Sequence, residues 1–480
     1  MGLVRPDASY PRPRGRVLVI SLQRLGDLLT AARVTGELSQ RDEVDRVELL
    51  HFSPTDAAAR LLPGVSRRHQ LDYNALKQLR HLHVFAAPTR LREALGSVYD
   101  RRGFDSVVNL TSTGFAAALA PALLAKRGRC FGPALSERGE LITHDPFSAY
   151  LNEIGTDPDL NVFAHQDLYA AAGTVDPGPG RLPLHDPEAR REAIDALGSL
   201  ARHATPPIAV HVHSSDIRKD WSNPMSFSGW RGLLNALARR QDGGVVLLGH
   251  PREAPVLQAL AESCPGRAVA ATCSLGATAE LLQRCSGLIS VDTVTIHLAA
   301  LVRCRSVILR LGPAGGAAFV PGDGALVVDP RRDCHPCRQA QCDTEPKLAC
   351  HRDLHVGDLA ELAHAHLFDR PLSAFASRRI AARVRVRVCE HSRSGLRRLV
   401  TPTWFPAPVA DQRVEASDDR WRCAWWSSFV EPGELDRSLV ARLLSPESEL
   451  EQRRLDRVLG LPSPLGAALR AASELRKVGA

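Results

Sequence analysis

The stretch GLISVDTVTIHLAA, residues 287–300, joins a short apolar run to an Asp-Thr turn and then to a helical pattern. A strand that feeds a helix through such a turn directs free N–H groups and the positive end of the helix dipole at one point, which suits phosphate. The alternative is an ordinary helix start, in which Asp292 or Thr293 is the cap and His297 is simply packed. The stretch alone leaves both interpretations open.

Alternating strands and helices extend from this stretch in both directions, and a Pro- and Gly-rich loop at 174–188 divides them into two halves. Two βαβ-rich halves predict an α/β protein with two doubly wound, Rossmann-like domains that face a cleft. Ligands of such sheets lie at the carboxyl ends of the strands. The predicted strands are residues 16–21, 46–52, 104–110, 129–133, 207–212, 244–249, 268–272, 287–292 and 306–312.

Composition predicts a soluble protein in a reducing compartment. The 480 residues include no apolar run of about eighteen residues that would span a membrane, and the opening MGLVRPDASYPRPRGR lacks the apolar stretch of a secretory signal. The 11 cysteines are an odd number and are scattered, which is typical of a cytoplasmic chain. A net charge of +8 favours an acidic partner such as a phosphate-bearing lipid, a glycan or a nucleic acid.

A series of motifs occurs in a fixed order between residues 16 and 365: SLQRLGDLL, HSSDIRKDW, LLGHPRE, DTVTIHLAA, LGP and CHPCRQAQC. This ordered series resembles the heptosyltransferases, glycosyltransferase family 9. The resemblance implies a GT-B fold, an ADP-sugar donor between the domains, and metal-independent transfer with inversion at the sugar carbon. The best-known family reaction adds heptose to the inner core of lipopolysaccharide.

The resemblance also assigns functions to the two halves. The expected organisation is a disordered lead-in (1–15), an acceptor-side Rossmann-like domain (16–175), a linker (176–188), a nucleotide-sugar-binding Rossmann-like domain (189–369) and a basic, helical C-terminal extension (370–480).

Two residues are the expected catalytic groups. Inverting transfer needs a base for the acceptor hydroxyl, and Asp27 in LGDLL matches the family's catalytic aspartate. The departing diphosphate needs cations or N–H groups, and Lys219, one of only five lysines, matches the family lysine that reaches it. The alternatives are a helix cap for Asp27 and a solvated basic loop for Lys219.

The remaining candidates bind the donor. Glu253 matches the family acid that holds the ribose hydroxyls, although an exposed glutamate in a first helical turn would look the same. Val294 stands where the family usually has glycine, so we expect a crowded turn and a narrower or altered donor site. The predicted donor-binding residues are Ser214, Ser215, Arg218, Glu253, Asp292, Thr293, Thr295 and His297.

Four cysteines have spacing that suits a tetrahedral metal site. They are Cys334, Cys337, Cys342 and Cys350, and the family often has cysteines at this point. The cluster predicts either a structural zinc or reduced or paired thiols, with no part in catalysis. No cofactor is expected to be required for transfer.

The tail beyond residue 370 lies outside the resemblance. Residues 371–400 hold eight arginines and one glutamate, and Arg and Val alternate in VRVRV, which predicts a strand with one basic face. This face fits either anionic lipid headgroups, at the inner face of the cytoplasmic membrane, or a phosphorylated glycan; a solvated strand is equally compatible. The residues beyond it predict a small helical appendage.

The sequence therefore favours an active glycosyltransferase with a nucleotide-sugar donor and a glycan or lipopolysaccharide-type acceptor. The second hypothesis is a catalytically weak GT-B protein that binds a nucleotide sugar or glycan, motivated by Val294 and the added tail. A nucleic-acid-binding protein is disfavoured, because it explains neither the Asp27, Lys219 and Glu253 set nor the two βαβ halves.

Overall fold

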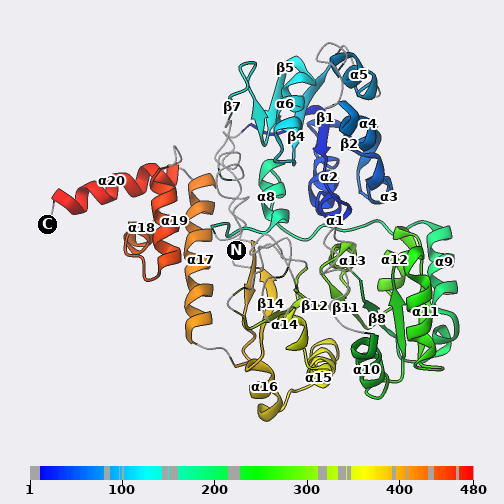
Figure 1. Ribbon diagram of the computed structural model, residues 1–480. Helices are drawn as coiled ribbons and strands as arrows, with labels where there is room; N and C mark the ends of the chain where they lie inside the picture. Colours follow the sequence, from blue (N-terminus) through cyan, green and yellow to red (C-terminus); the bar gives the residue numbers. More distant parts are fainter. Residues whose placement is uncertain are drawn as a thin grey trace.

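The computed structural model describes most of the chain, and its described part forms two α/β lobes with a group of C-terminal helices beside them (Figure 1). The described residues are 11–79, 87–96, 98–99, 102–142, 150, 160–213, 227–311, 322–332, 334, 342, 348–391, 396–406, 409–430, 437–460 and 464–478.

The first lobe is built on a parallel sheet with the strand order β3-β2-β1-β4-β5. Its strands are β1 (Gly15–Ser21), β2 (Val44–Phe52), β3 (Val65–Leu71), β4 (Phe104–Asn109) and β5 (Leu124–Phe131). Strand β3 was not predicted, because this edge strand buries little beyond His69 and Leu71 and so lacks an apolar run. The alanine-rich stretch GFAAALAPALLAK, residues 114–126, has a helical pattern throughout, but its helix ends at Ala122 because the chain from Leu124 onward pairs with β4.

Short helices surround this sheet. They are α1 (Leu25–Thr30), α2 (Ala32–Leu38), η1 (Ser53–Thr55), α3 (Asp56–Ala59), α4 (Tyr73–Leu79), α5 (Ala87–Ala94), α6 (Gly114–Ala122) and α8 (His165–Ala172). The short strands β6 (Ala134–Leu135) and β7 (Leu141–Ile142) pair with each other.

The second lobe has the sheet order β10-β9-β8-β11-β12-β13-β14-β15. Its strands are β8 (Ile208–His211), β9 (Val245–Leu248), β10 (Ala268–Ala271), β11 (Gly287–Val291), β12 (Ser306–Leu309), β13 (Leu326–Pro330), β14 (Val384–His391) and β15 (Arg397–Val400). The strands from β8 to β13 are parallel, whereas β14 and β15 are antiparallel additions from the tail. Together the two sheets confirm the predicted α/β class with two doubly wound lobes.

The helices of the second lobe follow the expected alternation with the strands. They are α9 (Pro187–Leu197), η2 (Gly198–Arg202), α10 (Phe227–Ala238), η4 (Pro251–Glu253), α11 (Ala254–Glu262), α12 (Leu275–Leu282), α13 (Val294–Leu301), α14 (Ala349–Arg352), α15 (Val356–Leu367) and α16 (Ala374–Ala381).

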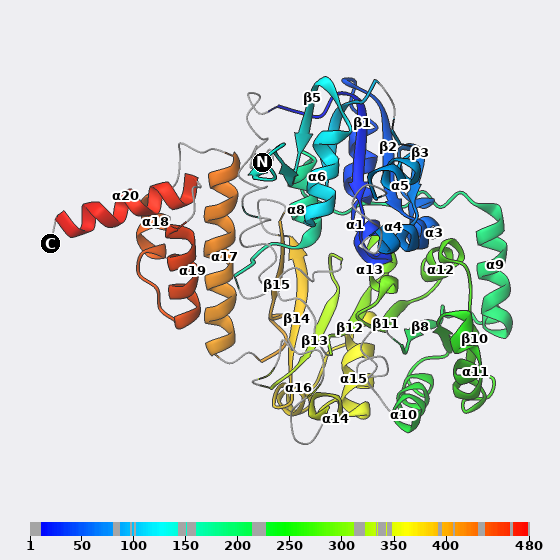
Figure 2. The same cartoon turned by 45° about the horizontal axis from the view of Figure 1, so that its top comes forward.

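The tail also forms α17 (Val409–Val430), α18 (Arg437–Leu443), α19 (Glu449–Leu459) and α20 (Pro464–Val478). In both views α17 runs beside β14 and β15 (Figures 1 and 2). Trp421 and Trp425 on α17 share an apolar core with Leu168 of α8, so the tail contacts the first lobe as well as the second.

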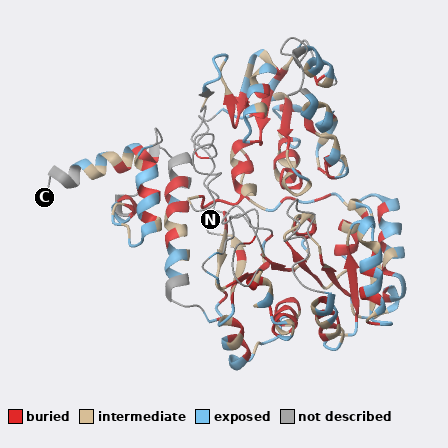
Figure 3. Cartoon of the chain, viewed as in Figure 1, coloured by how far each residue is buried: buried red, intermediate tan, exposed pale blue. Residues whose placement is uncertain are grey.

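Buried residues are continuous across the junction of the lobes (Figure 3). One apolar cluster contains Leu28 and Leu29 of α1 together with Ile296 and Leu298 of α13. Burial of apolar surface therefore stabilises the contact between the two lobes. Within the described residues, no helix is both long and apolar enough to cross a lipid bilayer.

A buried ion pair joins the tail to the first lobe. The Arg397 backbone N–H donates to Asp167 Oδ2 at 2.8 Å, and Arg397 Nη1 donates to Oδ1 at 3.2 Å. The two side chains are 4% and 0% exposed. Arg397 Nη2 also donates to the carbonyl of Gly178 in the linker, at 3.1 Å. Arg397 thus holds the tail against α8 and against the linker that follows it.

We predict that Arg397→Gln lowers the free energy of unfolding by about 3–5 kcal/mol, because it leaves the Asp167 carboxylate buried without its charge partner. Arg305→Gln is the matched control. It breaks the Arg305–Asp369 pair, whose side chains are 40% and 79% exposed, and so costs at most about 1 kcal/mol. Urea unfolding of both variants measures the difference, and equal losses would contradict a structural role for the buried pair.

Candidate active site

The carboxyl ends of β1 and β11 point toward the junction of the lobes, where α1 meets α13 (Figure 1). Asp27 lies in the first turn of α1 and is half-buried. A Cβ atom on the preceding Gly26 would lie 2.6 Å from His297 Cδ2 and 2.8 Å from its Nε2. Glycine at this position therefore lets α1 approach α13 closely enough to bring Asp27 beside His297.

Asp27 lies among three side chains whose pKa values are shifted by burial. Burial lowers the pKa of His297 to about 4, although the Asp27 charge opposes the shift and His165 adds to it. Burial also lowers the pKa of His165, again against Asp27, and raises that of Tyr169. Both imidazoles are therefore neutral near pH 7, so neither forms a charged pair with the Asp27 carboxylate.

Tyr169 and Gln23 fix the loop that precedes Asp27. The Tyr169 hydroxyl donates to Gln23 Oε1, and Gln23 Nε2 donates to the carbonyl of Leu110 at 2.7 Å. The Thr30 hydroxyl donates to the backbone carbonyl of Asp27 at 2.6 Å. These bonds hold the backbone on both sides of Asp27, while the described hydrogen bonds include none to its carboxylate.

His297 carries a buried polar atom whose partner is not in the described protein. Its Nδ1 has no hydrogen-bond partner among the described residues. His297 also lines a small cavity between the lobes, together with Thr30, Gln166 and Arg397. Because buried polar atoms in folded proteins are nearly always bonded, this atom marks a place for water or a ligand group.

The Asp-Thr turn enters α13 in the expected way. Thr293 is the N-cap residue and its side chain makes no cap hydrogen bond, while Asp292 is half-buried. Val294 is the first helical residue and does not belong to the non-glycine residues with positive φ. Val294 therefore has ordinary helical backbone, which a β-branched residue adopts readily, while the expected crowding of the donor site by its side chain stays a prediction. Its half-buried side chain packs on the core between the lobes.

Thr295 faces inward. Its hydroxyl is 2.5 Å from Nδ1 of His211, at the end of β8, and the residue is 2% exposed. Burial lowers the pKa of His211 to about 4, so the bond joins a neutral imidazole to a hydroxyl. In this conformation Thr295 connects β8 to α13, a structural contact in addition to the predicted donor-binding role.

Glu253 has a local structural role at the start of a helix, although its side chain is only 24% exposed and so differs from the exposed glutamate of the alternative. Its Oε2 accepts the His250 N–H at 2.8 Å and completes a capping box at η4. The other oxygen, Oε1, lies 3.8 Å from Nδ1 of His213, beyond the end of β8. That nitrogen is buried and has no hydrogen-bond partner within the described part of the chain. Glu253 and His213 thus meet at the carboxyl edge of the second sheet.

Four of the predicted site residues lie outside the described residues, namely Ser214, Ser215, Arg218 and Lys219. The sequence analysis missed His165, Tyr169, His211 and His213. His211 and His213 stand at the end of a predicted strand in AVHVHSS, and two histidines at that edge were a usable signal. Nothing in the sequence connects His165 to Asp27, because that contact depends on how α8 packs.

Two of the four clustered cysteines lie together. Cys342 and Cys350 are each 8% exposed and form an apolar cluster with Leu348. The Leu348 N–H donates to Cys342 Sγ at 3.2 Å. Cys334 is exposed, and Cys337 lies outside the described residues. Within the part of the chain that the structure describes, no three His, Cys, Asp or Glu side chains are grouped as metal ligands.

A family model for glycosyltransferase family 9 (heptosyltransferase) matches residues 164–346, from the start of α8 to the cysteine loop. This matched segment is similar to the glycosyltransferase family 9 domain, and we refer to it as the family 9 domain. It contains His165, Glu253 and the 292–297 turn, whereas Asp27 comes from the first lobe, outside the matched residues. The family 9 domain and the first lobe meet at the Gly26–His297 contact.

Several solved structures are similar to this chain. The Escherichia coli ADP-heptose lipopolysaccharide heptosyltransferase II is 14% identical, with a TM-score of 0.48 over 74% of this chain and 100% of its own. A glycosyltransferase family 9 protein from Veillonella parvula is 16% identical, with a TM-score of 0.47 over 63% and 83%. The iron-containing dodecameric glycosyltransferase TibC of E. coli is 14% identical, with a TM-score of 0.44 over 75% and 78%. None of the curated proteins matches this chain.

We predict that Gly26→Ala destabilises the junction between α1 and the family 9 domain by about 1–3 kcal/mol, the usual cost of overpacking. His297→Ala in the same chain removes the clash, so the double variant should recover much of the loss. Gly114→Ala is the control, because a Cβ atom there meets nothing within 4 Å. Thermal or urea unfolding of these variants forms a double-mutant cycle. Additive losses would show that Gly26 and His297 are not in contact.

Proposed function

We propose that this family 9 protein transfers a sugar, heptose or a similar one, from an ADP-sugar donor to a glycan or lipopolysaccharide-type acceptor, with inversion at the sugar carbon. The observation that carries the proposal is the position of Asp27, at the tip of the first lobe and against His297 of the family 9 domain. A base at this junction meets an acceptor bound by one lobe and a donor bound by the other.

In the proposed reaction an acceptor hydroxyl attacks the anomeric carbon of the donor while Asp27 accepts its proton. The bond from that carbon to the diphosphate oxygen breaks, and ADP leaves with the bonding electron pair. Lys219 and Arg218 are proposed to stabilise the charge on the leaving diphosphate, together with the N–H groups at the start of α13. The side chain of Thr293 makes no cap hydrogen bond at the start of α13. This supports the proposal that the N–H groups there bind the diphosphate.

The donor's other contacts follow the same scheme. Ser214, Ser215, Asp292, Thr293, Thr295 and His297 are proposed to line the donor site, with Glu253 on the ribose. The position of Glu253 at the carboxyl edge of the second sheet supports this, since ligands of doubly wound sheets bind there. The neutral imidazole of His297 has an Nδ1 with no partner among the described residues, and this atom is proposed to bond to a bound group.

The cysteines are proposed to hold a structural metal that takes no part in transfer. The residues fit such a group, because Cys342 and Cys350 are buried side by side and Cys342 Sγ already accepts a backbone N–H. Thiolate ligands commonly accept N–H bonds of this kind. Cys334 and Cys337 would complete a four-thiolate set, which suits zinc or iron. The bound ion would tie the loop after β13 to α14.

A catalytically weak sugar-binding protein was the alternative, and it was motivated by Val294 and by the added tail. The ordinary helical backbone at Val294 argues against unusual dihedral angles at this turn. An active transferase in the cytoplasm, at the membrane face where lipid-linked acceptors are found, is the proposal that we retain. The scattered cysteines support the reducing compartment.

We predict that Asp27→Asn leaves ADP affinity within about twofold of the parent while transfer falls by on the order of 10²–10⁴-fold, because the amide cannot accept the proton. Asp186→Asn is the matched control: Asp186 caps α9 through the Glu188 N–H, a role that asparagine also fills. ADP titration, melting temperature and sugar transfer are measured for both variants. Transfer at the parental rate in Asp27→Asn would exclude Asp27 as the base.

We predict that Cys342→Ser lowers both the metal content and the melting temperature, and that the folded fraction keeps its turnover at low temperature. Cys423→Ser is the control, because Cys423 is an exposed residue of α17 and lies outside the cluster. Elemental analysis of the purified protein, before and after a chelator, accompanies the melting curves. A metal-free parent whose melting temperature matches that of Cys342→Ser would contradict the metal site.

A further inference from the structure

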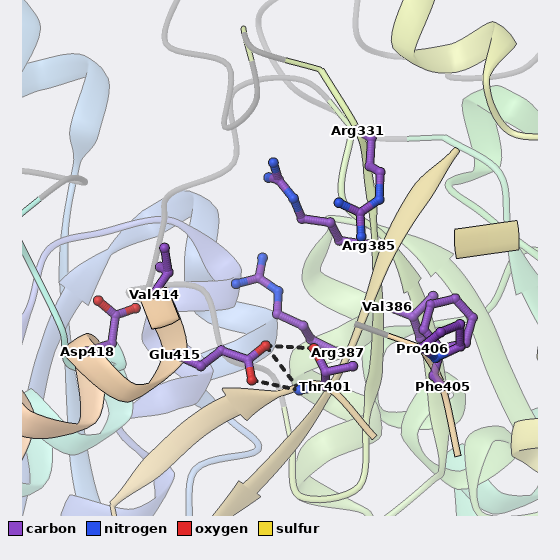
Figure 4. Close-up of a pocket in the computed structure, with 10 residues that line it drawn as sticks. All are labelled: Arg331, Arg385, Val386, Arg387, Thr401, Phe405, Pro406, Val414, Glu415 and Asp418. Carbon is purple, nitrogen blue, oxygen red and sulfur yellow. Dashed lines mark hydrogen bonds between the residues drawn. The ribbon is translucent and has the colours of Figure 1, made fainter. Parts of the chain in front are cut away.

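A second pocket lies away from the Asp27 site, between the tail strands and α17. Alternation along β14 sends Val384 and Val386 into the core of the second lobe and places Arg385 and Arg387 on the opposite face. This face does not stand open to solvent, because α17 lies across it (Figure 4). The predicted basic face is therefore a wall of a pocket.

The pocket has chemically distinct sides (Figure 4). Arg331, Arg385 and Arg387 line one side, Glu415 and Asp418 of α17 line the other, and Val386, Thr401, Phe405, Pro406 and Val414 complete it. Its volume is about 150 Å³. The enclosed part of the pocket therefore accepts a group of about the size of a phosphate, and the rest of a larger ligand would lie at its rim.

Described contacts hold the charged groups in place. Arg387 Nη2 donates to Asp329, which also binds Arg310, so one buried carboxylate serves two guanidinium groups. The buried Nε of Arg387 has no hydrogen-bond partner among the described residues. Arg331 Nε donates to the carbonyl of Ala381 at 2.7 Å. These contacts orient the arginines before any ligand binds, and the Arg387 Nε remains as a donor without an acceptor.

The carboxylates of Glu415 and Asp418 are held in place by donors other than the pocket arginines. Glu415 accepts the Thr401 N–H at 3.1 Å and its hydroxyl at 2.7 Å. Asp418 accepts from Arg454 of α19 at 2.7 Å. Each retains lone pairs for further donors, since a carboxylate accepts about four hydrogen bonds. A bare oxyanion would meet these negative groups, whereas a ligand with hydroxyl groups would bond to them.

We propose that this pocket binds a phosphorylated saccharide. The phosphate oxygens would accept hydrogen bonds from the arginine side, where planar guanidinium forks match an oxyanion better than lysines would. The sugar hydroxyls would donate to Glu415 and Asp418. The apolar rim at Phe405, Pro406 and the half-exposed Val414 offers a surface for the C–H face of the sugar ring. This site is separate from the transfer reaction and does not depend on it.

Isothermal titration with glucose 6-phosphate, in the presence of saturating ADP, tests the proposal. Inorganic phosphate and glucose are the comparison ligands, because the first lacks the sugar ring and the second lacks the phosphate. We expect glucose 6-phosphate to bind at least tenfold more tightly than either. Equal binding of inorganic phosphate would overturn the saccharide assignment, and failure of glucose 6-phosphate to bind at millimolar concentration would overturn the site.

Substitutions of pocket residues test whether glucose 6-phosphate binds in this pocket. Arg385→Gln should weaken glucose 6-phosphate at least tenfold, and Glu415→Gln should weaken glucose 6-phosphate more than it weakens inorganic phosphate. Arg378→Gln is the charge-matched control on α16, where Arg378 is exposed and outside the pocket. If Arg385→Gln does not fold, Arg385→Lys keeps the charge and loses the fork, and it should still lose affinity. Unchanged affinity in a folded Arg385 variant would place the ligand elsewhere. ADP affinity, measured alongside, should stay constant in every variant and reports separately on the transferase site.

Discussion

The ion pair between Arg397 and Asp167 is the interaction on which the arrangement of the lobes depends. Its two charges are removed from water, so each requires the other and the hydrogen bonds around it. Burial raises the pKa of Asp167, while Arg397 opposes that shift. Because Arg397 also binds the linker carbonyl of Gly178, the pair connects the second lobe's sheet, the linker and α8 at one point.

This connection extends to the candidate active site through α8. Asp167 lies between His165 and Tyr169 on one helix, and those two residues flank Asp27. Tyr169 bonds to Gln23 in the loop before α1. Arg397 and His297 also line the same cavity between the lobes. The tail, which lies outside the family 9 segment, therefore holds α8 in place, and α8 carries the two residues that flank the candidate base Asp27.

Several arginines of the tail and of the first lobe form ion pairs and hydrogen bonds within the fold. Arg398 binds both Glu390 and Asp419, and Arg422 binds Asp419 and the carbonyl of Val162. In the first lobe burial alone would raise the pKa of Glu48, but hydrogen bonds from Arg16, His69 and Arg46 lower it to about 2. Arginine suits these places because its fork bonds to a carboxylate with two donors at once. Net charge was thus a poor guide to an exposed basic surface.

The sequence by itself determined the local elements and the order of the chemistry-bearing motifs. Apolar runs between helical patterns place most strands of both sheets, because burial on both faces of a parallel sheet demands them, but β13 and β15 were not predicted. The Asp-Thr turn before α13 and the linker were readable because Pro, Gly and Asp mark turns. Edge strand β3 was not readable, since an edge strand needs few apolar side chains.

Only the tertiary structure decided which distant residues meet. The contact of Gly26 with His297, the placement of His165 beside Asp27 and the pairing of Arg397 with Asp167 join residues more than 130 positions apart. No periodicity encodes such contacts, because they follow from how whole helices pack across the junction. The environment of Val294 was decided in the same way: its dihedral angles depend on where α13 begins, and the helix begins at that residue. Likewise the alternating arginines of β14 specify a basic face, and the position of α17 turns that face into a pocket.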